Sequence, residues 1–212
     1  MSNYRTISGG PATQAMRLAI SALVVLTVAC GSSTTGPSAN MFHAEVSDAI
    51  GDAVASPAGR NPPDLAHGTV DVSGGSITFN IQFAPGTLDR QSTRLTIELD
   101  TDQNPSTGIS AAGPLGIDHV LDMWAPRGTQ TIVLRAMPAT CSSGGDCYIE
   151  VGTASLTLGT DAMAASVPLT MLGSASGRLN YRIFAYASPQ PTAPTLTADV
   201  MPDISSAPAH VP

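Results

Sequence analysis

The chain has 212 residues with nine basic and sixteen acidic side chains, which give a formal net charge of −7 at neutral pH. Lysine is absent, so arginine supplies every basic side chain. This acidic balance argues against nucleic acid, or an anionic membrane surface, as a partner recognised by charge. Removal of an N-terminal signal would leave about 180 residues, enough for one domain with a sizeable core.

The N-terminal part is typical of an export signal. Arg17 precedes the apolar run Leu18–Val28, and the run ends at a small residue followed by Cys30. The run is too short for a membrane-spanning helix, which needs about 20 apolar residues. A cysteine at this place resembles a bacterial lipoprotein signal, which implies that Cys30 is the palmitate-bearing first residue of the mature chain. The alternatives are an ordinary signal peptide cut nearby and a buried apolar helix.

These features divide the N-terminal region into three parts. Residues 16–29 form the expected signal peptide, and residues 1–15 are either a misassigned start before Met16 or an extended n-region. Residues 30–40 are rich in Ser, Thr and Gly and predict a flexible tether spanning roughly 18 Å. We therefore expect an exported protein that is lipid-anchored to the cell envelope, at the outer membrane or the cell surface.

Two further cysteines, Cys141 and Cys147, flank a Gly-Gly pair. In an exported protein this spacing predicts a hairpin loop closed by a disulfide bond, which contributes about 2 kcal/mol in the chain-entropy model. A metal site is the rival interpretation, but it lacks a second cysteine pair and a nearby histidine.

Residues 41–203 read as short strands and turns. Apolar and polar residues alternate at Phe42–Val46, and Gly74-Gly75 between two such runs indicates a hairpin. Strands are predicted at 69–73, 76–83, 95–99, 117–124, 130–136, 148–152, 154–158, 164–167 and 179–187, with one short helix at 168–173. This pattern predicts an all-β fold, a single-domain antiparallel β-sandwich, with a closed barrel as the main alternative. Residues 204–212 are expected to be a Pro-rich tail.

The segment from Asp100 to Gly108 is the strongest local motif. Asp100, Asp102 and Asn104 place three oxygen-bearing side chains at alternate positions directly after a strand, and calcium prefers such ligands. The loop is not an EF-hand, because Pro105 stands where glycine is required. The alternative is a turn in which these side chains cap backbone amides.

A second acidic turn contains Asp48 and Asp52, and a long loop after it ends at Asp64. These residues could complete the calcium site or form another. Aspartates in loops are also common as solvated turn formers.

The order D-x-x-G-D, P-D-L, L-D-T-D-Q-N-P-x-T-G and G-I-D-H-V along the chain resembles a group of exported bacterial β-sandwich domains. This is the DOMON and family 9 carbohydrate-binding-module group. The resemblance implies a structural calcium ion and a bound sugar or haem. It assigns the acidic turns to calcium, through the residues Asp48, Asp52, Asp100, Asp102 and Asn104, with Asp118 as a further candidate.

The sugar-binding members of that group stack sugars between aromatic side chains, whereas this chain has a single Trp. Trp124 could serve as one platform, with Asp122 and Arg127 as hydrogen-bonding groups. The alternative is a partly buried strand residue. A haem would need axial ligands such as His119 and Met123, which lie on one face of a strand.

No pattern predicts catalysis, because the chain lacks a G-x-S-x-G elbow and the expected disulfide leaves no free thiol. We expect a non-enzymatic envelope lipoprotein that binds an extracellular ligand, most simply a carbohydrate. The alternatives are a structural or adhesive envelope protein without a small-molecule site and a haem-binding DOMON-like protein.

Overall fold

The computed structural model describes residues 42–54, 62–110, 114–124, 131–136, 149–173, 176–187 and 196–212. The expected signal and tether, the lipid site at Cys30 and the expected Cys141–Cys147 disulfide lie outside these residues. Within the described ranges, every helix is too short or too polar to cross a membrane.

The described residues fold into strands and one short 3-10 helix, η1 (Leu169–Leu172). The strands are β1 (Phe42–Ser47), β2 (Leu65–Ser73), β3 (Ser76–Phe83), β4 (Thr93–Asp100), β5 (Ile109–Ser110), β6 (Gly116–Ile117), β7 (His119–Trp124), β8 (Thr131–Ala136), β9 (Ile149–Leu158), β10 (Ala162–Pro168), β11 (Leu179–Ala187), β12 (Leu196–Met201) and β13 (Ala209–Val211).

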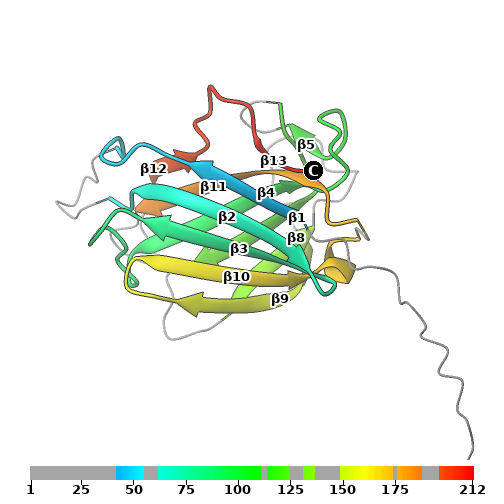
Figure 1. Ribbon diagram of the computed structural model, residues 1–212, viewed down its shortest axis with the longest axis horizontal. Helices are drawn as coiled ribbons and strands as arrows, with labels where there is room; N and C mark the ends of the chain where they lie inside the picture. Colours follow the sequence, from blue (N-terminus) through cyan, green and yellow to red (C-terminus); the bar gives the residue numbers. More distant parts are fainter. Residues whose placement is uncertain are drawn as a thin grey trace, which may run out of the picture. The chain divides into compact units, whose positions relative to one another are not determined.

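Antiparallel hydrogen bonding connects ten of these strands in the order β1-β2-β3-β10-β9-β8-β7-β4-β11-β12. β13 joins this sheet through β11, and β5 pairs with β6 separately. The sheet curls until β1 lies against β13 and β12 against β2, so it is nearly closed and barrel-like (Figure 1).

The prediction of an all-β antiparallel fold is confirmed. A sandwich consists of two packed sheets, whereas here the hydrogen bonding runs from β1 to β12 without a break. In the described residues the arrangement is thus closer to the barrel alternative. The pairings of β3 with β10 and of β4 with both β7 and β11 create this continuity.

Alternating side chains fill the inside of the curled sheet. In β3, Ile77, Phe79, Ile81 and Phe83 are all buried, as the period of two predicts. Phe79 meets Tyr181 of β11 edge to face, with ring centroids 5.7 Å apart. The same core cluster includes residues from β2 to β13, so one apolar core fixes the strand ends that carry the polar sites.

The turn between β2 and β3 confirms the predicted hairpin. Gly74 and Gly75 have φ angles of 58° and 80°. Two consecutive positive φ angles define the type I′ turn, whose twist matches that of the flanking strands.

Three segments can be compared directly with the expected elements. The 3-10 helix η1 lies within the expected short helix at 168–173. The two strands expected at 148–152 and 154–158 are one strand, β9. The segment 204–212 was expected to be a tail, but it contains β13, because the fully buried Val211 packs into the core beside β11.

Candidate functional site

The loop after β1, residues 48–54, is fixed between β2 and β12 at one end of the sheet (Figure 1). The amide of Val54 donates to the carbonyl of Ala198 at 2.7 Å, and the amide of Gly51 donates to Oδ2 of Asp64 at 2.8 Å. Gly51 has a φ of 93°, which a residue with a side chain rarely adopts. The loop therefore brings its aspartates against those at the start of β2 and in β12.

Asp52, Asp64 and Asp199 form the more buried of two carboxylate groups at this end. One carboxylate oxygen of each lies within 4.8 Å of the others. Asp64 is 5% exposed and Asp199 is 8% exposed. Among the described atoms, Oδ1 of Asp64 is buried without a hydrogen-bond partner. An ionised oxygen in that position is costly unless a cation compensates it.

Asp48, Asp52 and Asp203 form the second, more exposed group, and Asp52 is common to both. The turn that begins at Asp203 is held by two hydrogen bonds. The amide of Ser206 donates to the carbonyl of Asp203 at 2.8 Å, and the guanidinium of Arg182 donates to the carbonyl of Ser206 at 2.8 Å. Five carboxylates therefore converge at this end, and we call them the acidic end (Asp48, Asp52, Asp64, Asp199 and Asp203).

The electrostatics of the acidic end favour protons or a cation. Burial, together with the negative charge of Asp199, raises the pKa of Asp48 to about 7. Burial likewise raises the pKa of Asp199 to about 6. The hydrogen bonds from the amides of Leu65 and Val200 oppose this increase, and the charges of Asp52 and Asp64 add to it. A divalent cation would favour the ionised forms instead.

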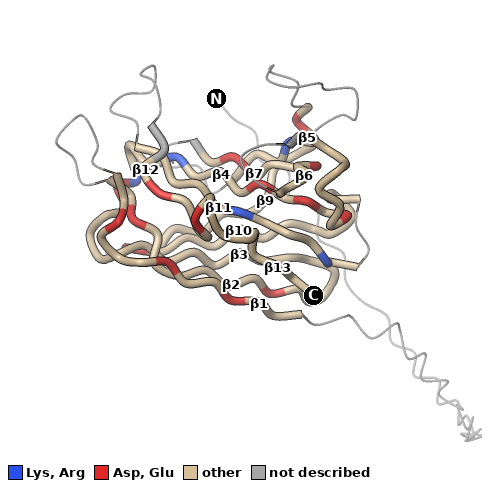
Figure 2. The backbone as a smooth tube through the Cα atoms, turned by 90° about the horizontal axis from the view of Figure 1, so that it is seen from above, with Lys and Arg blue, Asp and Glu red and all other residues tan. Residues whose placement is uncertain are grey.

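A pocket of about 580 Å³ adjoins the acidic end. Three of the five carboxylates line it, and its remaining wall is largely aliphatic. The lining residues are Asp52, Val54, Ala198, Asp199, Val200, Asp203, Ile204 and Ser205. Figure 2 shows acidic residues gathered in the loops near β12.

The loop after β4 also brings its predicted ligands together, but their oxygens already accept hydrogen bonds. Oxygens of Asp100, Asp102 and Asp118 lie within 4.8 Å of one another. The amide of Asn104 donates to Asp100 and Asp102 at 3.0 and 2.9 Å, and Thr107 donates to Asp102 at 2.8 Å. These are the bonds of a self-capped turn, which was the alternative interpretation of this motif.

Other contacts in this loop agree with the turn interpretation. Asn104 uses its side-chain oxygen to accept from the amide of Ser106 at 3.1 Å, and Asp118 accepts from the amide and hydroxyl of Thr101 at 2.9 and 3.0 Å. Burial raises the pKa of Asp100. For Asp102 burial acts in the same direction, but the hydrogen bonds from Thr107 and Asn104 outweigh it and lower the pKa.

Asp122, expected as a ligand-binding group, is 6% exposed and lies between two arginines. Arg94 donates to both of its oxygens at 2.9 and 2.8 Å, and Arg135 donates to Oδ2 at 3.0 Å. Trp124 ends β7, but its side chain lies outside what the structure describes, as does Arg127.

His119 and Met123 lie on β7 at positions that face the same way. Met123 is a member of the apolar core, and Nδ1 of His119 is buried without a hydrogen-bond partner among the described atoms. Burial lowers the pKa of His119.

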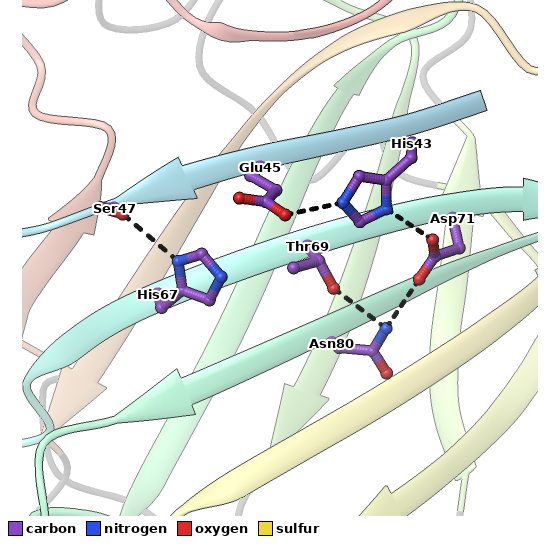
Figure 3. A network of polar contacts seen from close by, with 7 residues as sticks. All are labelled: His43, Glu45, Ser47, His67, Thr69, Asp71 and Asn80. Carbon is purple, nitrogen blue, oxygen red and sulfur yellow. Dashed lines mark hydrogen bonds and ion pairs between the residues drawn. The ribbon is translucent and has the colours of Figure 1, made fainter.

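The outer face of β1, β2 and β3 carries an exposed polar network (Figure 3). The ring of His43 contacts Asp71 at 2.7 Å and Glu45 at 2.9 Å. The amide of Asn80 donates to Asp71 and to Thr69, both at 3.2 Å. Hydrogen bonds to Glu45 and then to Asp71 raise the pKa of His43.

A second pocket, of about 430 Å³, lies beside this network on β3, β9 and β10. Asn80 and Gln82 supply amide groups to it, and Ala162 and Ala164 leave space. It is a second surface on which a polar ligand could lie.

No protein family matches the chain, and no curated protein matches it. The residues of the structure therefore carry the functional argument alone.

The sequence pattern missed Asp199 and Asp203 as members of the acidic end. Both were visible in the segment 198–203, where they follow apolar residues near the end of a strand. Asp199 reaches Asp52 and Asp64, and Asp203 reaches Asp48 and Asp52. Both depend on the approach of β12 to β2, a contact between segments that are about 130 residues apart.

Proposed function

We propose that the chain is a cell-envelope lipoprotein, anchored through Cys30, whose β-domain holds a structural calcium ion and binds an extracellular carbohydrate. The observation that carries this proposal is the unpartnered Oδ1 of the buried Asp64, in a group with Asp52 and Asp199. Calcium binds six to eight oxygens at 2.3–2.6 Å, drawn from carboxylates, carbonyls and water. Three aspartates with an unsatisfied buried oxygen suit such an ion.

The direction of β1 separates the acidic end from the point where the tether would join the domain. The tether would join at Phe42, whereas the acidic end follows Ser47 at the other end of the strand. Six residues of strand span about 20 Å. A ligand at the acidic end would thus meet the domain on the side away from its attachment.

A glycan array probed with the purified, unlipidated protein in 1 mM calcium tests the carbohydrate part of this proposal. We expect retention of a defined set of glycans. If no glycan is retained and the protein binds another envelope component, the structural or adhesive alternative is favoured. For the anchor, Cys30→Ala should abolish incorporation of radiolabelled palmitate, and undiminished labelling would refute lipidation at that residue.

A further inference from the structure

The carboxylate group and the neighbouring pocket share two residues. Asp52 and Asp199 belong to the group of three and also line the pocket, whereas Asp64 belongs to the group alone. A cation held by the three carboxylates would have the buried Asp64 on one side and the pocket on the other.

We propose that a neutral sugar residue occupies this pocket and binds the calcium ion directly through two adjacent hydroxyl groups. The inference rests on the proposed calcium site and names the ligand contact that this site makes. Three neighbouring carboxylates alone do not indicate a calcium ion. The buried, unpartnered Oδ1 of Asp64 is the independent observation that calls for a cation.

The number of protein ligands leaves room for the sugar. Three carboxylates supply between three and six oxygens, depending on whether each binds through one oxygen or two. Oδ2 of Asp64 already accepts a hydrogen bond from Gly51, and both oxygens of Asp199 accept bonds from the amides of Leu65 and Val200. Fewer than six oxygens are therefore readily free, so a calcium ion keeps open positions for hydroxyl groups or water.

Charge selects the class of ligand. One dication and three carboxylates leave a net negative charge, and Asp203 adds another at the pocket wall. Among the described residues that line the pocket, none is basic. A phosphate or carboxylate ligand would be repelled by this surplus, whereas a neutral diol would not. We therefore assign the pocket to an uncharged sugar.

The shape and lining of the pocket agree with this assignment. Its volume of about 580 Å³ lies within the usual range for small-molecule sites. Val54 and Ile204, which are 67% and 49% exposed, present aliphatic carbon beside the carboxylates. The C–H face of a pyranose ring can pack against them while its hydroxyl groups point to the ion.

Calorimetry with the methyl glycosides of mannose, galactose, glucose and fucose tests the proposal, in 1 mM calcium and in EDTA. Two variants distinguish the contribution of the calcium ion from that of the pocket wall. Asp64→Asn removes an ion ligand outside the pocket, and Ile204→Ala shortens the wall without touching a carboxylate. Ile149→Ala, on an exposed position of β9, is the matched control.

We expect at least one glycoside to bind in calcium and not in EDTA. Asp64→Asn should weaken that binding by about tenfold or more. Ile204→Ala should weaken it by about fivefold while calcium titrates normally. Ile149→Ala should leave both unchanged.

Three results would overturn the inference. Glycoside binding that survives EDTA and Asp64→Asn but is lost in Asn80→Ala would place the sugar on the polar outer face and leave the carbohydrate function standing. Binding of inorganic phosphate, without binding of any glycoside, would show that the pocket takes an anion and not an uncharged sugar. A protein that takes up no calcium at all would remove the calcium site and this inference together.

Discussion

The carboxylate of Asp199 in β12 accepts a hydrogen bond from the amide of Leu65, the first residue of β2, at 2.5 Å. This bond joins strands from opposite ends of the sheet order and places Asp199 next to Asp64. One contact thus helps close the sheet and assembles the acidic end. The approach of β12 to β2 therefore closes the sheet and also brings together the carboxylates of the candidate calcium site.

Without calcium, the protein should lose stability as the pH rises from about 4 to about 7. Burial raises the pKa of Glu98 and of Asp48 to about 7 and that of Asp199 to about 6. In this window the folded state retains protons that the unfolded state has released, so the free energy of unfolding falls with pH. Urea unfolding in EDTA at several pH values measures this slope.

Glu98→Gln should flatten part of that slope, and the exposed Glu150→Gln should not. Because calcium binds the ionised aspartates, calcium affinity should increase between pH 5 and pH 8. A stability in EDTA that rises steadily from pH 4 to pH 7 would contradict the assignment of raised pKa values.

Asp122→Asn should destabilise the protein by about 3 kcal/mol without changing glycoside affinity. The substitution removes the charge that Arg94 and Arg135 share in a nearly buried position. Chemical denaturation measures the loss of stability, and a glycoside titration measures the affinity. Lost sugar binding in a variant that still melts cooperatively would instead support the expected ligand role of Asp122.

Gly116→Ala should destabilise the loop after β4 by about 2–3 kcal/mol. A Cβ at this position would lie 2.4 Å from the carbonyl oxygen of Thr107 and 2.5 Å from that of Asn104. Relief of these clashes would require the backbone of the loop to move, because both contacting atoms are backbone oxygens. If the loop is a self-capped turn, calcium stoichiometry should be unchanged in this variant, and a lost calcium equivalent would show that the loop also holds an ion.

Val211→Ala should lower stability by about 2 kcal/mol, the usual cost of removing buried methyl groups. Val211 is fully buried in β13, and β13 pairs with β11. Thermal denaturation measures the effect. An unchanged melting temperature would mean that the last residues act as the tail the sequence predicted.

In an NMR titration, His43 should ionise above its ordinary pKa of 6.5. Glu45→Gln and Asp71→Asn should each lower that pKa, because each removes a hydrogen-bonded carboxylate. Neither should change stability much, since the whole network is exposed. A wild-type value at or below 6.5 would be inconsistent with the contacts drawn in Figure 3.

Local patterns predicted the local parts of this molecule. The alternation in β3 and the Gly74-Gly75 turn depend on neighbouring residues, and both match the structure. The acidic turn at Asp48 and Asp52 was also visible, because turn residues cluster in sequence. The continuity of the sheet, and the approach of Asp199 to Asp64, depend on pairings between distant segments. No periodicity in a single sequence reports such pairings.

The apparent strength of a motif was also misleading. The Asp100–Gly108 loop has the more regular spacing of oxygens, yet backbone and hydroxyl donors already occupy them. The Asp64 carboxylate stands alone in the sequence, yet one of its oxygens is buried without a partner, as is one oxygen of Asp48. Spacing gives the number of possible ligands, whereas only the fold determines which remain free.

The melting temperature in calcium and in EDTA tests the central claim most directly. At a free calcium concentration a hundredfold above Kd, binding adds about 2.7 kcal/mol to stability, which predicts a rise of about 5–10 °C. The rise should vanish in Asp64→Asn and persist in Asp102→Asn. An equal melting temperature with and without calcium, or a rise lost only in Asp102→Asn, would contradict the account.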